Sequence, residues 1–168
     1  ALPFGQLPVL DVDGVQIPQT TAIIRYVARQ FGFEPANPVD NALCDALIEE
    51  INGEFIAALT PWHIVNVGII KGGDKDALYQ KFVPQRKRCF EQFTQFLKKN
   101  NTGSGYAVGD KLTYADLVLA NQIEWLQVLD PEGAKILDGF PELKAHMDKV
   151  LKDPRLAEYM EKRPAEWY

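Results

Sequence analysis

The sequence predicts a short α/β segment followed by an all-α domain. Two β-prone runs flank Asp13-Gly14, the two-residue turn whose twist matches that of a β-hairpin. From Asn37 onward the strand pattern stops, and apolar residues recur at helical spacing. We therefore expect an α/β part at residues 1–33 and an all-α helical bundle at residues 34–168.

The α/β part is expected to hold a hairpin at residues 8–17 and a helix at residues 22–32. Ile23 and Phe31 fall on one face of that helix. A two-stranded hairpin is marginal in water, because one helix covers only one face and leaves an unpaired edge. We therefore expect residues 1–33 to be the second half of an α/β unit whose first strands are absent from this chain.

The first helix of the bundle is expected to begin at Asn37-Pro38, because Asn suits the N-cap and Pro the first helical position. Asn52-Gly53 should weaken or bend this helix, since Gly costs about 1 kcal/mol relative to Ala in a helix interior. Apolar side chains recur along it at every fourth position: Leu43, Leu47, Ile51, Phe55 and Leu59.

The rest of the bundle alternates helical runs with breaks. A helix is expected at residues 75–100, bent at Pro84 because proline removes one backbone hydrogen bond. Another is expected at residues 141–152, and a last short helix follows it. The two terminal aromatics, Trp167 and Tyr168, are expected to lie across the surface.

The most sharply defined helix start is at Thr113. The Thr113 side chain can accept the N–H of Asp116, and the Asp116 carboxylate can accept the N–H of Thr113, which together form a capping box. Residues 117–129 behind this cap are apolar on more than one face, so other helices should surround them. The capping box is a structural signal and carries no function by itself.

Composition argues against several classes of partner and location. The net charge is 18 − 23 = −5 with no long basic run, which argues against nucleic acid as a partner. The sequence has no run of eighteen apolar residues and no signal segment at its start, so no membrane association is expected. Cys44 and Cys89 are expected to be reduced core thiols, which favours a cytoplasmic location.

The common catalytic and metal-binding patterns are missing from the sequence. His63 and His146 are far apart and lack Cys or Asp partners at ligand spacing, so no metal site is expected. There is no nucleophile elbow, P-loop or dinucleotide fingerprint. Neither cysteine has a histidine near it in the sequence that would mark it as a nucleophile.

Two short stretches have the chemistry to bind a ligand. Pro8 precedes a strand, and a cis bond there would turn the backbone of Leu7 outward, where an extended peptide-like ligand can pair with it. At the following helix start, the Gln19 amide, the Thr20 hydroxyl and free backbone N–H groups suit a carboxylate. Taken singly, each is more often a plain turn or a plain cap. Together they describe a slot for a small peptide with a free carboxylate.

These same stretches resemble a known family. Residues 2–14, Leu-Pro-Phe-Gly-Gln-Leu-Pro-Val-Leu-Asp-Val-Asp-Gly, and residues 19–26 resemble the second half of the glutathione-binding domain of glutathione transferases. The likeness is greatest to the sigma class, which includes glutathione-dependent prostaglandin D synthases. Residues 109–117 resemble the capped helix of the family's all-helical domain. The resemblance implies a thioredoxin-like N-terminal domain, glutathione as co-substrate and a homodimer.

The family pattern implies a glutathione site in this sequence. The Leu7 backbone beside a cis-Pro8 would pair with the cysteinyl part of glutathione, and Gln6 would lie at the glycyl end. Gln19 and Thr20 would bind the γ-glutamyl carboxylate, with Thr in place of the usual Ser. The glutathione-binding residues implied in this way are Gly5, Gln6, Leu7, Pro8, Gln19 and Thr20.

Two further contacts are implied by the resemblance. An acidic residue of the partner subunit approaches the glutamyl amine in this family. Glu54 is preferred over Asp45 and Glu49 for this role, because Phe55 resembles the aromatic residue that follows the acid. A proline–tryptophan pair lines the electrophile pocket of some sigma-class members, so Trp62 is expected there.

The implied activity is conjugation of the glutathione thiolate to apolar electrophiles, as in detoxification, with a sigma-type isomerase or peroxidase activity as a variant. The family activates the thiol with a tyrosine near the start of the N-terminal domain, and no tyrosine here holds that position, so the catalytic residue is unknown. The alternative is a non-catalytic binding or structural relative, or an inactive fragment. We expect that alternative if these 168 residues are the whole polypeptide.

Overall fold

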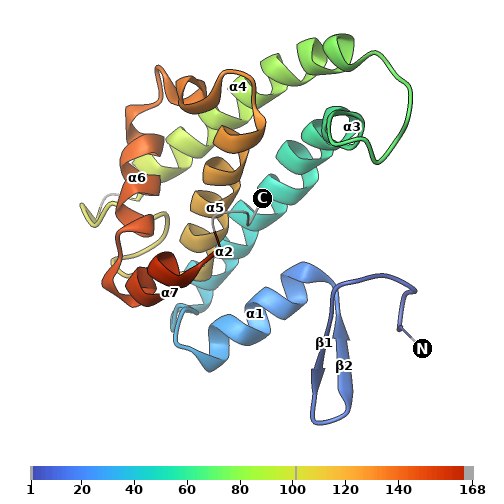
Figure 1. Cartoon of the computed structure of the whole chain (residues 1–168). Helices are drawn as coiled ribbons and strands as arrows, with labels where there is room; N and C mark the ends of the chain where they lie inside the picture. Colours follow the sequence, from blue (N-terminus) through green and yellow to red (C-terminus); the bar gives the residue numbers. More distant parts are fainter. Residues whose placement is uncertain (1, 101, 165–168) are drawn as a thin grey trace.

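The computed structural model describes residues 2–100 and 102–164. It has a two-stranded sheet, one helix packed beside it and an all-helical part (Figure 1). This order confirms the predicted fold class, a small α/β part followed by a helical bundle. The terminal pair Trp167 and Tyr168 lies outside the described residues.

The sheet is an antiparallel hairpin. Strand β1 (Val9–Val12) pairs with β2 (Val15–Pro18), so that Val12 lies opposite Val15. Asp13 and Gly14 connect the strands with φ of 52° and 86°, the left-handed conformations that a tight hairpin turn requires. Helix α1 (Thr20–Gln30) follows directly and lies between the hairpin and the helical part in Figure 1.

Among the described residues, the helical part contains six α-helices, with short 3₁₀ and π segments between some of them. The elements in chain order are α2 (Pro38–Glu50), η1 (Ile51–Ile56), α3 (Ala57–Asn66), α4 (Lys75–Lys99), α5 (Tyr114–Leu129), η2 (Gly133–Leu137), α6 (Pro141–Leu151), η3 (Pro154–Leu156) and α7 (Ala157–Lys162). Helix α4 continues through Pro84 as a single helix. Among the described residues, no helix is both long enough and apolar enough to cross a membrane.

The hydrophobic core is built around α5, which packs against α2, α6 and α1. Its buried face includes Leu119, Ile123 and Leu126, whereas Val128 on the opposite face is 58% exposed. A second part of the core is aromatic. Phe55 lies about 6 Å, centroid to centroid, from Phe82 and from two further phenylalanines of α4.

The predicted irregularity at Asn52-Gly53 is a π-helical turn, η1. In an α-helix, side chains at every fourth position drift by about 40° per turn, because the repeat is 3.6 residues. Leu47, Ile51 and Leu59 nevertheless all point into the core and are at most 2% exposed. The π turn takes up one extra residue and so corrects the drift. Its polar residues remain on the surface.

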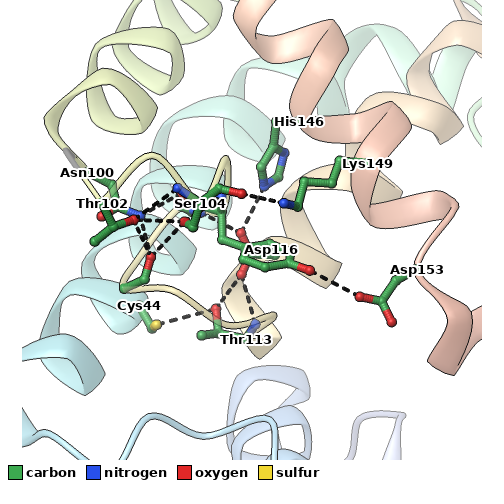
Figure 2. Close-up of polar contacts among 12 residues, drawn as sticks. Cys44, Asn100, Thr102, Ser104, Thr113, Asp116, His146, Lys149 and Asp153 are labelled. Atoms are coloured by element: carbon green, nitrogen blue, oxygen red, sulfur yellow. Dashed lines mark hydrogen bonds and ion pairs between the residues drawn. The ribbon is translucent and has the colours of Figure 1, made fainter.

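The capping box at the start of α5 is formed (Figure 2). The Asp116 carboxylate accepts the backbone N–H and the hydroxyl of Thr113, each at 2.8 Å, and the N–H of Ala107 at 2.6 Å. The Cys44 thiol donates to the Thr113 hydroxyl at 3.6 Å. The cap therefore ties the loop before α5 to the core of the bundle.

Candidate functional site

The two predicted ligand-binding stretches meet in space. The peptide bond between Leu7 and Pro8 is cis, and Leu7 is 78% exposed. This segment and the start of α1 line a small hollow of about 40 Å³ at the end of β2. Its lining residues are Phe4, Gln6, Leu7, Pro8, Pro18, Gln19 and Thr20. Gly5, the remaining predicted residue, is exposed in the adjoining turn, with its N–H donated to the carbonyl of Leu2.

Gln19 precedes α1 in an unusual backbone conformation. Its φ is +74°, a region that costs a residue with a side chain about 1–3 kcal/mol. No side chain caps α1, and its first turn carries no acidic residue. The first-turn N–H groups and the positive end of the helix dipole therefore have no side-chain counter-charge from their own helix. A helix start with free N–H donors can bind a carboxylate.

A second hollow of about 550 Å³ adjoins the first, and Gln19 and Thr20 form the ridge between them. Its wall comes from the start of α1 and from the end of α2 with η1. Asn52, in η1, donates from Nδ2 to the hydroxyl of Thr21, in α1, at 3.1 Å. The lining residues are Gln19, Thr20, Thr21, Ala22, Arg25, Glu49 and Asn52.

An ion pair holds α1 against the helical part. Arg25 Nε donates to Asp45 at 2.6 Å, and a second guanidinium nitrogen contacts the other carboxylate oxygen. The Tyr114 hydroxyl donates to the same Asp45 carboxylate at 2.7 Å, and the Tyr114 N–H donates to the Phe33 carbonyl at 3.0 Å. Asp45 is therefore engaged within its own chain.

A third hollow, apolar and of about 560 Å³, lies where α1 faces α5 and the C-terminal helices. Ile24 and Val27 of α1 and Leu117 and Val118 of α5 contribute to its lining. Thr20 reaches its edge. This hollow has an apolar wall, in contrast to the polar one at Asn52.

The contacts of the two histidines and the two cysteines indicate structural roles. His146 Nε2 lies 2.9 Å from Asp116 in the core (Figure 2). The His63 ring lies edge-on to Trp125, and burial lowers its pKa. Both thiols are free and buried, and burial raises the pKa of each to about 11. Within residues 2–100 and 102–164, no three His, Cys, Asp or Glu side chains gather as a metal site would require.

Comparison with known proteins decides the family. Residues 71–163 match the family model of the glutathione S-transferase C-terminal domain. The chain belongs to the glutathione S-transferase family. A curated relative, the probable glutathione S-transferase 7 of Caenorhabditis elegans, is 38% identical over 163 residues, which are 96% of this chain and 76% of that protein.

Solved glutathione S-transferase structures superpose on nearly all of the chain. The monomeric Na-GST-3 of Necator americanus is 42% identical with a TM-score of 0.87, over 99% of this chain and 78% of that one. A Nu-class enzyme of Haemonchus contortus is also 42% identical, with a TM-score of 0.83 and the same coverage. The prostaglandin synthase D of Nilaparvata lugens is 29% identical, with a TM-score of 0.79 over 96% and 76% of the two chains.

Glu54 and Trp62, which the glutathione transferase pattern suggested, lie apart from the hollow at Leu7. Glu54 is half-exposed and pairs with Arg88 of α4 in its own chain. Of the three acidic candidates, Glu49 is the one that lines a hollow with Gln19 and Thr20. Figure 1 places η1, which carries Glu54, in the long helical run formed by α2 and α3.

Trp62 is a core residue in this glutathione transferase. It is 1% exposed, and its ring stacks on Phe82 with centroids 5.8 Å apart and planes 6° apart. Tyr79 packs against the same ring at 5.2 Å. Trp62 lines neither of the hollows that Gln19 and Thr20 share, so packing is the role that its surroundings explain.

Sequence reasoning missed Asn52 and Thr21. Thr21 lies in the stretch at residues 19–26 but carries no predicted role there, and Asn52 is expected only to weaken or bend its helix. The signal that could have pointed to Asn52 is the four-residue spacing of the apolar positions around it. Apolar residues that recur every four positions stay on one face only if one turn contains an extra residue, because an α-helical turn has 3.6 residues. The polar residues of that turn are then displaced towards a neighbouring element.

Proposed function

We propose that this chain contributes the glutathione site of a glutathione transferase, which conjugates the thiolate of glutathione to apolar electrophiles. One observation carries the proposal. The Leu7-Pro8 segment and the Gln19-Thr20 helix start are separated by the hairpin, yet they line one hollow. Family membership supplies the reaction class, and the curated relatives are named for the same transferase activity.

Each residue has a proposed role in binding glutathione. The exposed Leu7 backbone pairs with the cysteinyl part, and Gln6 lies towards the glycyl end. The Thr20 hydroxyl, the Gln19 amide and the first-turn N–H groups of α1 hold the γ-glutamyl carboxylate. The absence of a side-chain cap on α1 supports this assignment, because those donors are available to a ligand.

We assign no residue of this chain to activation of the thiol. None of the tyrosines among the described residues lines either of the hollows that share Gln19 and Thr20. The alternative expected from the sequence is a non-catalytic glutathione-binding relative. The two candidates share the binding site and differ in turnover.

The finer class and assembly are also proposals. The 42% identity to a Nu-class structure, against 29% to a prostaglandin synthase D, favours a Nu-class relationship over the sigma class expected from the motifs. We propose a division into a thioredoxin-like part at residues 1–33 and a helical domain at residues 34–168. We also propose a cytoplasmic location and a homodimer in which the partner subunit's acidic residue, Glu54 by resemblance, reaches the glutamyl amine. Sedimentation equilibrium tests the dimer.

Titration with glutathione tests the site. Thr20→Val removes the hydroxyl at nearly constant volume, and we expect its Kd for glutathione to rise about 10- to 150-fold, because a hydrogen bond to a charged group contributes about 1.5–3 kcal/mol. Thr60→Val is the matched control, since the Thr60 hydroxyl donates to the Ile56 carbonyl one turn earlier in the same helical run and Thr60 lines neither hollow. Wild-type protein that does not bind glutathione would refute the proposal.

A conjugation assay with an apolar electrophile then separates the two candidates. Binding with turnover supports the transferase, and binding without turnover supports the non-catalytic relative. The assay uses the folded protein, verified by its circular dichroism spectrum. A Thr20→Val variant that binds as tightly as wild type would remove Thr20 from the site.

A further inference from the structure

We propose that Asn52 is a positioning residue, which holds the first turn of α1 so that Gln19 and Thr20 present their donors to the γ-glutamyl carboxylate. The inference rests on the proposed glutathione site and adds to it a residue from the helical part of the chain. It also gives a role in the site to the π-helical turn η1, which contains none of the proposed glutathione-binding residues.

The contact that carries the inference is the hydrogen bond from Asn52 Nδ2 to the Thr21 hydroxyl, at 3.1 Å. Thr21 is adjacent to Thr20 and belongs to the same first turn of α1. Asn52 also lines the hollow on whose ridge Gln19 and Thr20 lie. It therefore connects the start of α1 to the helical run that begins at Pro38.

The π turn explains how Asn52 comes to face α1. Ile51 and Phe55 are both fully buried, which fixes the two ends of the turn in the core. The residues between them, Asn52, Gly53 and Glu54, are exposed. Asn52 at one end of this exposed stretch reaches α1, and Glu54 at the other reaches Arg88 of α4.

The first turn of α1 is in need of an external support. Gln19 has a φ of +74°, and a residue in such a conformation persists only when its surroundings hold it there. No side chain of α1 caps the helix. In the described part of the chain, Asn52 makes the side-chain hydrogen bond that reaches residues 19–22. Its loss should leave the strained turn free to relax.

Two substitutions remove the hydrogen bond from its opposite ends. Asn52→Ala removes the donor and Thr21→Val removes the acceptor, whereas Thr21→Ser keeps it. We expect Asn52→Ala and Thr21→Val each to raise the Kd for glutathione about three- to tenfold, the effect of one hydrogen bond. The double variant should have a Kd for glutathione no higher than that of either single variant. Thr21→Ser should bind glutathione like wild type. Thr60→Val on α3 remains the control.

Amide hydrogen exchange provides a readout that needs no ligand. In Asn52→Ala, exchange at Ile23, whose N–H donates to the Gln19 carbonyl at 3.0 Å, should become faster, while exchange in α5 stays as in wild type. Faster exchange together with a raised Kd supports the inference. Unchanged exchange overturns it, and so does faster exchange with an unchanged Kd. If wild-type protein does not bind glutathione, the proposed function fails, and the exchange rates alone decide whether Asn52 holds the turn.

Discussion

His146 Nε2 lies 2.9 Å from Asp116 Oδ1, and both side chains are buried. This contact joins the middle of α6 to the first turn of α5. The same Asp116 carboxylate accepts the N–H groups of Ala107 and Thr113. One side chain therefore connects a loop, a helix start and a neighbouring helix.

Asp116→Ala should lower the free energy of unfolding by about 3–5 kcal/mol, because it leaves several buried donors without an acceptor. Urea denaturation measures the loss. Asp110→Ala is the control, since Asp110 is an exposed aspartate in the same loop and should change stability little. Equal stability losses in the two variants would contradict the central role of Asp116.

Gly53→Ala should stabilise the protein by about 1 kcal/mol, the difference in helix propensity between the two residues. A Cβ at Gly53 would meet no atom within 4 Å beyond the neighbouring backbone of its own helix. Gly14→Ala provides the contrast, because Gly14 has a φ of +86° in the hairpin turn and should lose stability. Thermal unfolding should show a raised Tm for Gly53→Ala and a lowered Tm for Gly14→Ala. A destabilised Gly53→Ala would show that the π turn needs its glycine.

Trp62→Ala should lower the free energy of unfolding by about 3–5 kcal/mol, as expected for a large buried aromatic residue. Trp125→Ala serves as control, because Trp125 is half-buried and should lose less. Both variants are then compared in the conjugation assay with an apolar electrophile. A Trp62 variant of unchanged stability but raised KM for the electrophile would return Trp62 to the electrophile pocket.

Stability should fall in acid partly through Asp153. The Arg155 guanidinium, which donates to this carboxylate at 2.9 and 3.0 Å, lowers the pKa of Asp153 to about 2. A lowered pKa in the folded state means that the stabilisation is complete above the ordinary value of 3.8 and is lost as the pH falls through about 2. Carboxyl NMR titration measures this pKa directly.

An Asp153→Asn variant tests the same contribution by its removal. Its unfolding free energy should decrease less steeply than that of wild type between pH 4 and pH 2, values that bracket the two pKa values of Asp153. An identical acid dependence in the variant and in wild type would assign the loss to other carboxylates. Arg155→Gln should raise the pKa of Asp153 towards its ordinary value.

The fold was predictable where local rules and long-range packing agree. The Asp13-Gly14 turn and the Thr113 capping box each use a short pattern with one structural solution, and both form. The meeting of Leu7 with Gln19 was also foreseeable, since a single hairpin separates them. Such features need no knowledge of distant contacts.

Other features depend on contacts between residues far apart in the sequence. The hydrogen bond between Asn52 and Thr21 spans 31 positions, and the pairing of Glu54 with Arg88 spans 34. The burial of Trp62 follows from the stack with Phe82 on another helix. No local pattern identifies these partners, because each depends on how the helices pack.

The π turn at Ile51–Ile56 also changes how positions in this chain are equated with those of its relatives. A helix that absorbs an extra residue in one turn keeps its faces aligned on both sides, so a gap in a sequence alignment belongs inside that turn. Placed elsewhere, the gap would shift every helical position between it and the turn by about 100°. The acidic residue equivalent to Glu54 is therefore to be identified by superposition of backbones.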